Sequence, residues 1–139
     1  MALVHDFGIV PNDYSESFLN AEAEKVSIPD DILYYIGDSL KWVRTIWNGK
    51  YESDSINYYG FSYIEGNNLR LLLEVVTAWR KLFSLSPDII TIRTGYLIDA
   101  KRYEYHSFQK EDILCLFDGW RKLCLQAIND NNKIMHIGI

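Results

Sequence analysis

The sequence predicts an α+β fold in which an antiparallel sheet packs against helices. Three long segments show apolar residues with the 3.6-residue period of a helix. Between them lie short runs rich in β-branched and aromatic residues, which are typical of strands. From residue 56 onward the expected order is strand, helix, strand, strand, helix, strand. This is the order of the ferredoxin-like split βαβ fold, here with an added N-terminal helix.

The size of the chain favours a single domain over residues 1–139. A chain of 139 residues with 48% hydrophobic residues can bury a core of its own. We expect a helical N-terminal extension over 1–50 and two βαβ-like units over 56–139. Charges interrupt the apolar runs well short of the roughly 18 residues that a membrane helix needs, and the first residues show no charged-then-apolar leader. We therefore expect a cytoplasmic protein that does not bind membranes.

The first 26 residues show short, ambiguous patterns. Residues 3–10 are compatible with a strand that ends at Pro11, and residues 15–26 are compatible with a short capped helix. A clearer helix is expected over 27–49, because Ser27 is a suitable N-cap and Gly49 suits the residue after a helix. One apolar stripe runs along it, formed by Leu33, Ile36, Leu40, Val43 and Trp47.

The rest of the chain alternates more clearly between the two periods. The expected elements are a strand over 56–64, a helix over 69–83, a hairpin of strands over 88–98 and 99–108, a helix over 107–128 and a last strand over 133–139.

A tetrapeptide, Trp-Arg-Lys-Leu, occurs at 79–82 and again at 120–123. Both copies lie at equivalent places in an expected helix, so we interpret them as marks of two similar structural units. In each copy Trp and Leu are expected to be buried and Arg and Lys to reach solvent. The alternative is a phosphate-binding face formed by Arg80, Lys81, Arg121 and Lys122.

Motifs of known catalytic chemistry are absent from the sequence. Its glycine segments lack the pattern of a phosphate-binding loop, and no Gly-x-Ser-x-Gly occurs. His5, His106 and His136 show no metal-ligand spacing. We therefore expect no catalytic residue, no metal and no cofactor. The alternative is a small α+β enzyme or ligand-binding domain, in which Glu104 tunes His106 as a general base on one face of the hairpin.

Negative charge is concentrated in the first half of the chain. Residues 1–65 contain eleven acidic and four basic residues, a net charge of −7, whereas residues 66–139 have a net charge of +2. Phosphate would be repelled by the first half, so we expect no nucleic-acid partner. A basic protein partner is expected instead.

Ten tyrosines accompany this charge, many of them next to acidic residues. Tyrosine provides a large contact area with little loss of entropy and is enriched in protein interfaces. The expected partner-binding residues are Glu16, Glu22, Glu24, Asp38, Tyr51, Glu52, Asp54 and Tyr58.

In overall character this short, acidic, tyrosine-rich chain without catalytic motifs resembles the immunity proteins of bacterial contact-dependent growth inhibition and related polymorphic toxin systems. The resemblance implies an antitoxin function, in which the protein binds one cognate toxin domain, often a basic nuclease, and neutralises it. A different hypothesis is a self-associating regulatory or structural domain, in which the last strand, ending at Ile139, pairs as an exposed edge with a second copy.

Overall fold

The protein has an α+β architecture, in agreement with the sequence-based prediction. The computed structural model describes residues 3–139. The elements are β1 (Val4–Val10), β2 (Lys25–Pro29), α1 (Asp30–Leu40), β3 (Arg44–Trp47), β4 (Tyr51–Asp54), β5 (Phe61–Ile64), α2 (Gly66–Ser84), β6 (Ile89–Leu97), β7 (Arg102–Gln109), α3 (Lys110–Asn129) and β8 (Lys133–Ile137). None of the helices in this part of the chain is long and apolar enough to cross a membrane.

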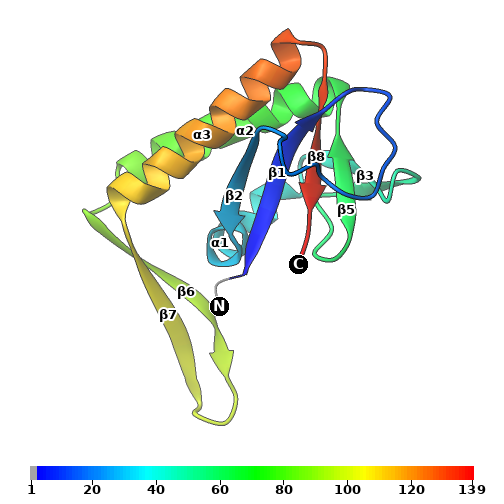
Figure 1. Cartoon of the computed structure of the whole chain (residues 1–139). Coiled ribbons are helices and arrows are strands. Elements are labelled where there is room, and N and C mark those ends of the chain that lie inside the picture. Colours follow the sequence, from blue (N-terminus) through cyan, green and yellow to red (C-terminus); the bar gives the residue numbers. More distant parts are fainter. Residues whose placement is uncertain (1–2) are drawn as a thin grey trace.

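The main sheet has six strands in the order β2-β1-β8-β5-β3-β4 within residues 3–139, and neighbouring strands run antiparallel (Figure 1). The last strand, β8, lies between β1 and β5. Both of its edges are therefore already hydrogen-bonded. The hypothesis that the last strand pairs as a free edge with a second copy is wrong for this reason.

Helices α2 and α3 pack side by side on one face of this sheet (Figure 1). The two tryptophans of the repeated tetrapeptide meet there, with 5.7 Å between the ring centroids of Trp79 and Trp120. Both are buried, as is Leu123, but Leu82 is exposed, so the prediction for the first copy is only half correct. Arg80 pairs with Asp118 of α3 across a 3.0 Å contact.

The opposite face of the sheet is covered by the loop between β1 and β2. Tyr14 and Leu19 of this loop pack against the second apolar cluster, whose buried members are Val10, Tyr63 and Met135. The hydroxyl of Tyr63 donates to the carbonyl of Glu16 (2.8 Å). This segment was compatible with a short helix in the sequence, but it forms a loop, because its apolar side chains are used on the sheet.

The prediction of a helical N-terminal extension over 1–50 is wrong for the described residues. β1 and β2 are strands of the main sheet, and the helix α1 covers only Asp30–Leu40. Residues 44–47, which continue the helical spacing of apolar residues, form β3 instead. The cause is the turn that follows: Asn48 and Gly49 both have positive φ, and Trp47 accepts a hydrogen bond from Lys50 (2.9 Å). An Asn-Gly pair strongly favours this hairpin turn.

The strands β6 and β7 form a hairpin that extends away from the body of the protein, which we call the arm (Figure 1). In the ferredoxin-like fold the four strands of the two units share one sheet. Here, within residues 3–139, β6 and β7 pair with each other and not with the main sheet, so the ferredoxin-like arrangement is not confirmed. The local order of strands and helices was predicted, but not the place of the hairpin.

Candidate functional site

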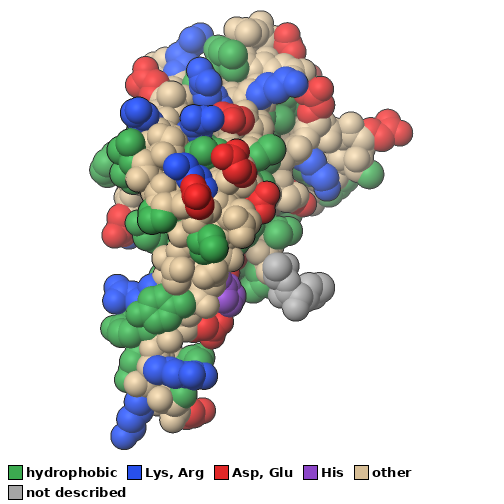
Figure 2. Space-filling model, turned by 90° about the vertical axis from the view of Figure 1, so that its left-hand side faces the viewer, with side chains coloured by type: hydrophobic (Ala, Val, Ile, Leu, Met, Phe, Trp, Pro, Cys, Tyr) green, Lys and Arg blue, Asp and Glu red, His purple; other side chains and the backbone are tan. Residues whose placement is uncertain are grey.

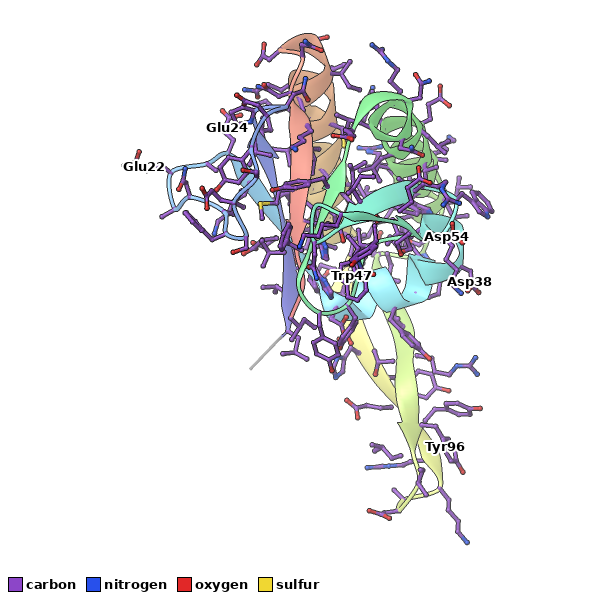
Figure 3. The ribbon with its side chains drawn as sticks, turned by 90° about the vertical axis from the view of Figure 1, so that its right-hand side faces the viewer. Glu22, Glu24, Asp38, Trp47, Asp54 and Tyr96 are labelled. Atoms are coloured by element: carbon purple, nitrogen blue, oxygen red, sulfur yellow. The ribbon has the colours of Figure 1, made fainter. Side chains whose placement is uncertain are left out.

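The eight predicted partner-binding residues lie in two separate places. Figure 3 shows Glu22 and Glu24 on one side of the molecule, in the loop between β1 and β2, which also contains Glu16. Asp38 of α1 and Asp54 of β4 lie on the other side. Tyr51 and Glu52 belong to the same strand as Asp54. The structure therefore does not gather these carboxylates into one patch.

Bases of the protein itself neutralise part of the second group. Arg44 contacts Asp54 (3.0 Å) and Glu52 (3.6 Å), and Lys41 contacts Asp38 (3.1 Å). All of these side chains are at least half exposed, so each pair is weak and open to exchange with a partner. The net negative charge of this side is smaller than the sequence suggests.

A depression of about 460 Å³ opens beside α1, and we call it the α1 pocket. It is lined by two carboxylates, two tyrosine rings, one lysine and an apolar floor, with the full lining being His5, Asp30, Leu33, Tyr34, Gly37, Asp38, Leu40, Lys41, Ser55, Ile56 and Tyr58. Its size lies in the range of ligand-binding clefts. Only two of its lining residues, Asp38 and Tyr58, belong to the predicted partner-binding set.

Asp30 is held in this pocket by a chain of hydrogen bonds. His5 Nε2 lies 3.0 Å from one carboxylate oxygen, and the hydroxyl of Tyr58 lies 3.2 Å from the other. His5 Nδ1 lies 2.9 Å from Nε2 of His136. A carboxylate only accepts, so His5 donates to Asp30 from Nε2, and the tautomers of the two rings set which one donates between His5 and His136. The carboxylate is therefore held in place before any ligand arrives.

Burial explains the protonation states of His136 and Tyr58, the two ends of this series of hydrogen bonds. Burial and the neighbouring His5 lower the pKa of His136 to about 3, so His136 is neutral at physiological pH. Its Nδ1 has no hydrogen-bond partner among residues 3–139. At the other end, burial and the nearby Asp30 raise the pKa of the Tyr58 hydroxyl, which therefore remains a donor.

The sequence did not reveal this series of hydrogen bonds, because its members are far apart in the sequence. His5 and His136 are 131 residues apart and meet because β1 pairs with β8. The only sign of it in the sequence is the two-residue alternation of side chains along the first strand. His5 and Phe7 alternate with Asp6, and both point toward the helices, where Phe7 joins the main core.

Exposed aromatic side chains surround the α1 pocket. Tyr34, which lines the pocket, is 67% exposed, and Trp42, two residues after the end of α1, is 68% exposed. Tyr58 packs edge-to-face on Tyr59, with 5.0 Å between ring centroids. Large apolar rings left in solvent around a hollow are typical of an interaction site.

The Tyr58 loop is held by the C-terminal end of the chain, and this contact can be tested. The amide of Ile139 donates to the carbonyl of Tyr58 (2.9 Å), and that of Gly138 donates to Gly60 (2.7 Å). A Cβ atom at position 138 would overlap the backbone carbonyl of Tyr58. We expect Gly138→Ala to lower the free energy of unfolding by roughly 1–3 kcal/mol in urea titration, as overpacking does. Faster amide exchange at Ile139 should accompany this loss.

Gly37→Ala is the matched control. Gly37 is in α1, and a Cβ atom there would meet nothing within 4 Å. Alanine should stabilise the helix by about 0.5–1 kcal/mol. Equal stability of Gly138→Ala and the wild-type protein would contradict the described contact.

His106, the best catalytic candidate from the sequence, lies on β7 at the base of the arm. It contacts the carboxylate of Asp31 through Nδ1 and that of Glu104 through Nε2, the latter at 3.2 Å. The hydrogen bond and charge of Asp31 raise the pKa of His106, with a smaller contribution from Glu104. Each ring nitrogen is thus engaged by a carboxylate, and neither is left free to take a proton from a substrate. The contact with Asp31 instead ties the arm to α1.

A second hollow of about 410 Å³ lies at this junction, lined in part by Asp30, Asp31 and His106. Among residues 3–139, no group of three or more His, Cys, Asp and Glu side chains is arranged to hold a metal ion. The proposed phosphate-binding face of the alternative interpretation would include Arg80, but its guanidinium is paired with Asp118.

Comparisons of the chain with protein families, with curated proteins and with solved structures found no match.

Proposed function

We propose that this protein is an immunity-type inhibitor that binds a basic toxin domain and neutralises it. Its partner-binding surface is the side of the molecule around the α1 pocket, which we call the α1 face and define by Tyr34, Asp38, Trp42, Tyr51, Glu52, Asp54 and Tyr58. The observation that carries the proposal is the α1 pocket itself, where two carboxylates and two tyrosine rings surround an open hollow.

This combination suits the side chain of a lysine or arginine from the partner. Asp30 is held by His5 and Tyr58, so it loses little conformational entropy when it pairs with a cation. The rings of Tyr34 and Tyr58 provide faces for the aliphatic stem and for cation–π contact. Tyrosine and tryptophan are the residues that most often dominate binding energy at interfaces, and carboxylates speed the association of a basic partner.

The acidic loop between β1 and β2 is not part of this surface. Glu22 and Glu24 lie on the other side of the molecule from Asp38 and Asp54 (Figure 3). They provide an internal comparison, because a charge change there alters the net charge of the protein equally but leaves the α1 face intact.

The proposal is tested by purifying the protein encoded by the neighbouring gene and measuring whether it binds this chain. Tyr34→Ala combined with Asp38→Lys should weaken the affinity measured by calorimetry about 30-fold or more, since even one interface hot spot is worth at least about 2 kcal/mol. Both side chains are exposed, so the fold should be retained. The same variant should no longer protect cells that express the toxin domain.

Glu22→Lys is the matched control, since it changes the net charge by the same amount as Asp38→Lys. It should leave the affinity within a few-fold of the wild-type value at physiological salt, where distant charges are screened. Equal loss of affinity in both variants would mean that only net charge matters. Absence of binding to the neighbouring gene product would contradict the proposed function.

A further inference from the structure

The outer half of the arm is left without a core. Near its base, Ile92 is buried, and Ile90 and Phe108 pack against the main core. Beyond Ile92 the apolar side chains are exposed, up to 79% at Ile98, and they include Tyr96, Leu97, Tyr103 and Tyr105. An isolated two-stranded hairpin is marginally stable in water, and both long edges of this one have unpaired backbone groups. Such a surface favours the binding of another protein chain.

The charges of the arm indicate the kind of surface to which it can bind. Its outer part, residues 93–105, contains Arg93, Lys101 and Arg102 against two acidic residues, Asp99 and Glu104, a net charge of +1. Figure 2 shows Lys or Arg side chains next to apolar ones on the arm, at the bottom of the view, with acidic side chains among them. The rest of the chain has a net charge of −6, since the whole chain has −5. The outer arm is therefore opposite in sign to the body, where α1 carries Asp30, Asp31 and Asp38.

The acidic surface lies at the base of the arm. α1 packs against β6, and Asp31 at the start of α1 contacts His106 of β7. Asp30 lines both hollows, and Asp38 follows two turns later along the same helix. The basic tip and the acidic base are thus at opposite ends of one arm.

This arrangement is self-complementary under two-fold symmetry. The outer part of the arm, from Arg93 to Ile98, spans about 20 Å at about 3.3 Å per residue. When two arms lie antiparallel along each other, the tip of each comes to the base of the other. Each basic tip then meets the acidic α1 of the second copy, and the exposed tyrosines of the two arms cover each other.

We propose that two copies of this chain associate through their arms in a reciprocal dimer, in which the basic tip of each arm docks at the α1 pocket of the other copy. The apolar side chains of the outer arm are buried between the copies. Because the contact is reciprocal, both arms are bound and neither is left exposed. This goes beyond the proposed inhibitor function. The dimer covers the same pocket that a basic toxin would use, so a tightly bound toxin displaces the arm.

Sedimentation velocity and light scattering over a wide concentration range test the proposal. At low salt the mass is expected to rise from 16.3 kDa toward twice that value. Lys101→Glu combined with Arg102→Glu should weaken the dimer on the order of 100-fold, because like charges then meet at the pocket. Asp38→Lys, at the pocket end, should also weaken it. High salt should shift the equilibrium toward monomer.

Arg121→Glu combined with Lys122→Glu is the matched control. These exposed residues are on α3, and the pair carries the same change of charge as the arm variant. The control should dimerise like the wild-type protein. A monomer at all concentrations would overturn the proposal, as would a dimer that resists the arm variant. A dimer sensitive to the arm variant but not to Asp38→Lys would overturn the docking at the pocket.

The two proposals fail in different ways. The monomeric Lys101→Glu, Arg102→Glu variant keeps the whole α1 face, so it should bind a basic toxin domain at least as tightly as the wild-type protein. Loss of toxin binding in Tyr34→Ala combined with Asp38→Lys, together with a wild-type that stays monomeric, would leave the inhibitor function standing and remove the dimer. Dimerisation without any toxin binding would support the dimer and remove the inhibitor function.

Discussion

Replacement of Trp120 by alanine is expected to lower the free energy of unfolding by about 3–5 kcal/mol, the range typical of a fully buried tryptophan. Trp120 lies where the main sheet meets the two long helices. Its ring centroid is 4.5 Å from that of Phe7 on β1 and 5.7 Å from that of Trp79 on α2. Alanine would leave a cavity between three elements that come from distant parts of the chain, and neither helix can close it without losing its contact with the other.

Urea unfolding of Trp120→Ala, followed by far-UV circular dichroism, measures this loss. Two other variants serve as comparisons. Leu125→Ala lies on the exposed side of the same helix and should change stability by less than about 0.5 kcal/mol. Trp120→Phe should cost less than Trp120→Ala, because it keeps most of the apolar volume and removes an indole N–H that has no acceptor in the described residues. A loss below about 1 kcal/mol in Trp120→Ala would contradict the described core.

The second large effect is a loss of stability in mild acid that originates from His136. The pKa of this side chain is lowered by burial and by His5 from 6.5 to about 3 in the folded protein. Between these two values the unfolded chain binds a proton that the folded protein does not. Stability therefore rises with pH in this interval and is lost as pH falls below 6.5, by on the order of 1 kcal/mol for each pH unit from this group alone.

The expected curve can be measured by urea unfolding at a series of pH values below neutrality. His136→Asn should flatten it, because an asparagine amide can donate to or accept from His5 but does not titrate. His106→Ala is the control for the other perturbed histidine. The pKa of His106 is raised, so its contribution is present below 6.5 and is lost as pH rises through its folded value. His106→Ala therefore should not remove the loss of stability at low pH. An unchanged pH curve in His136→Asn would contradict the neutral, buried state of His136.

Local patterns predicted the second half of the chain well. The helix expected over 69–83 is α2, at Gly66–Ser84, and the helix expected over 107–128 is α3, at Lys110–Asn129. α3 begins later than expected because Ser107 and Phe108 still belong to β7. The hairpin and the last strand are also present. In long amphipathic segments of this kind, the spacing of apolar residues within one segment is enough to identify it as a helix or a strand.

The strand that residues 3–10 were compatible with is present as β1 (Val4–Val10), but the rest of the first half was predicted poorly because its elements are short. The apolar spacing of α1 continues by coincidence through Val43 and Trp47, and only the Asn-Gly turn indicated that a strand follows. The candidate site was missed for a related reason. Asp38 and Tyr58 were chosen for charge and ring type, whereas the residues that shape the pocket, His5 and Asp30, depend on how β1 lies against β8 and α1.

By itself the sequence determined the α+β class, the two long helices, the hairpin and the excess of negative charge in the first half. These are properties of composition and of side-chain periodicity, which each segment shows without its neighbours. Only the tertiary structure decided that β8 lies inside the sheet, that His5 meets His136, that the acidic residues divide between two sides and that the hairpin extends as an arm. Those features depend on which distant segments pair, and pairing is set by the packing of the whole chain and not by any one stretch of it.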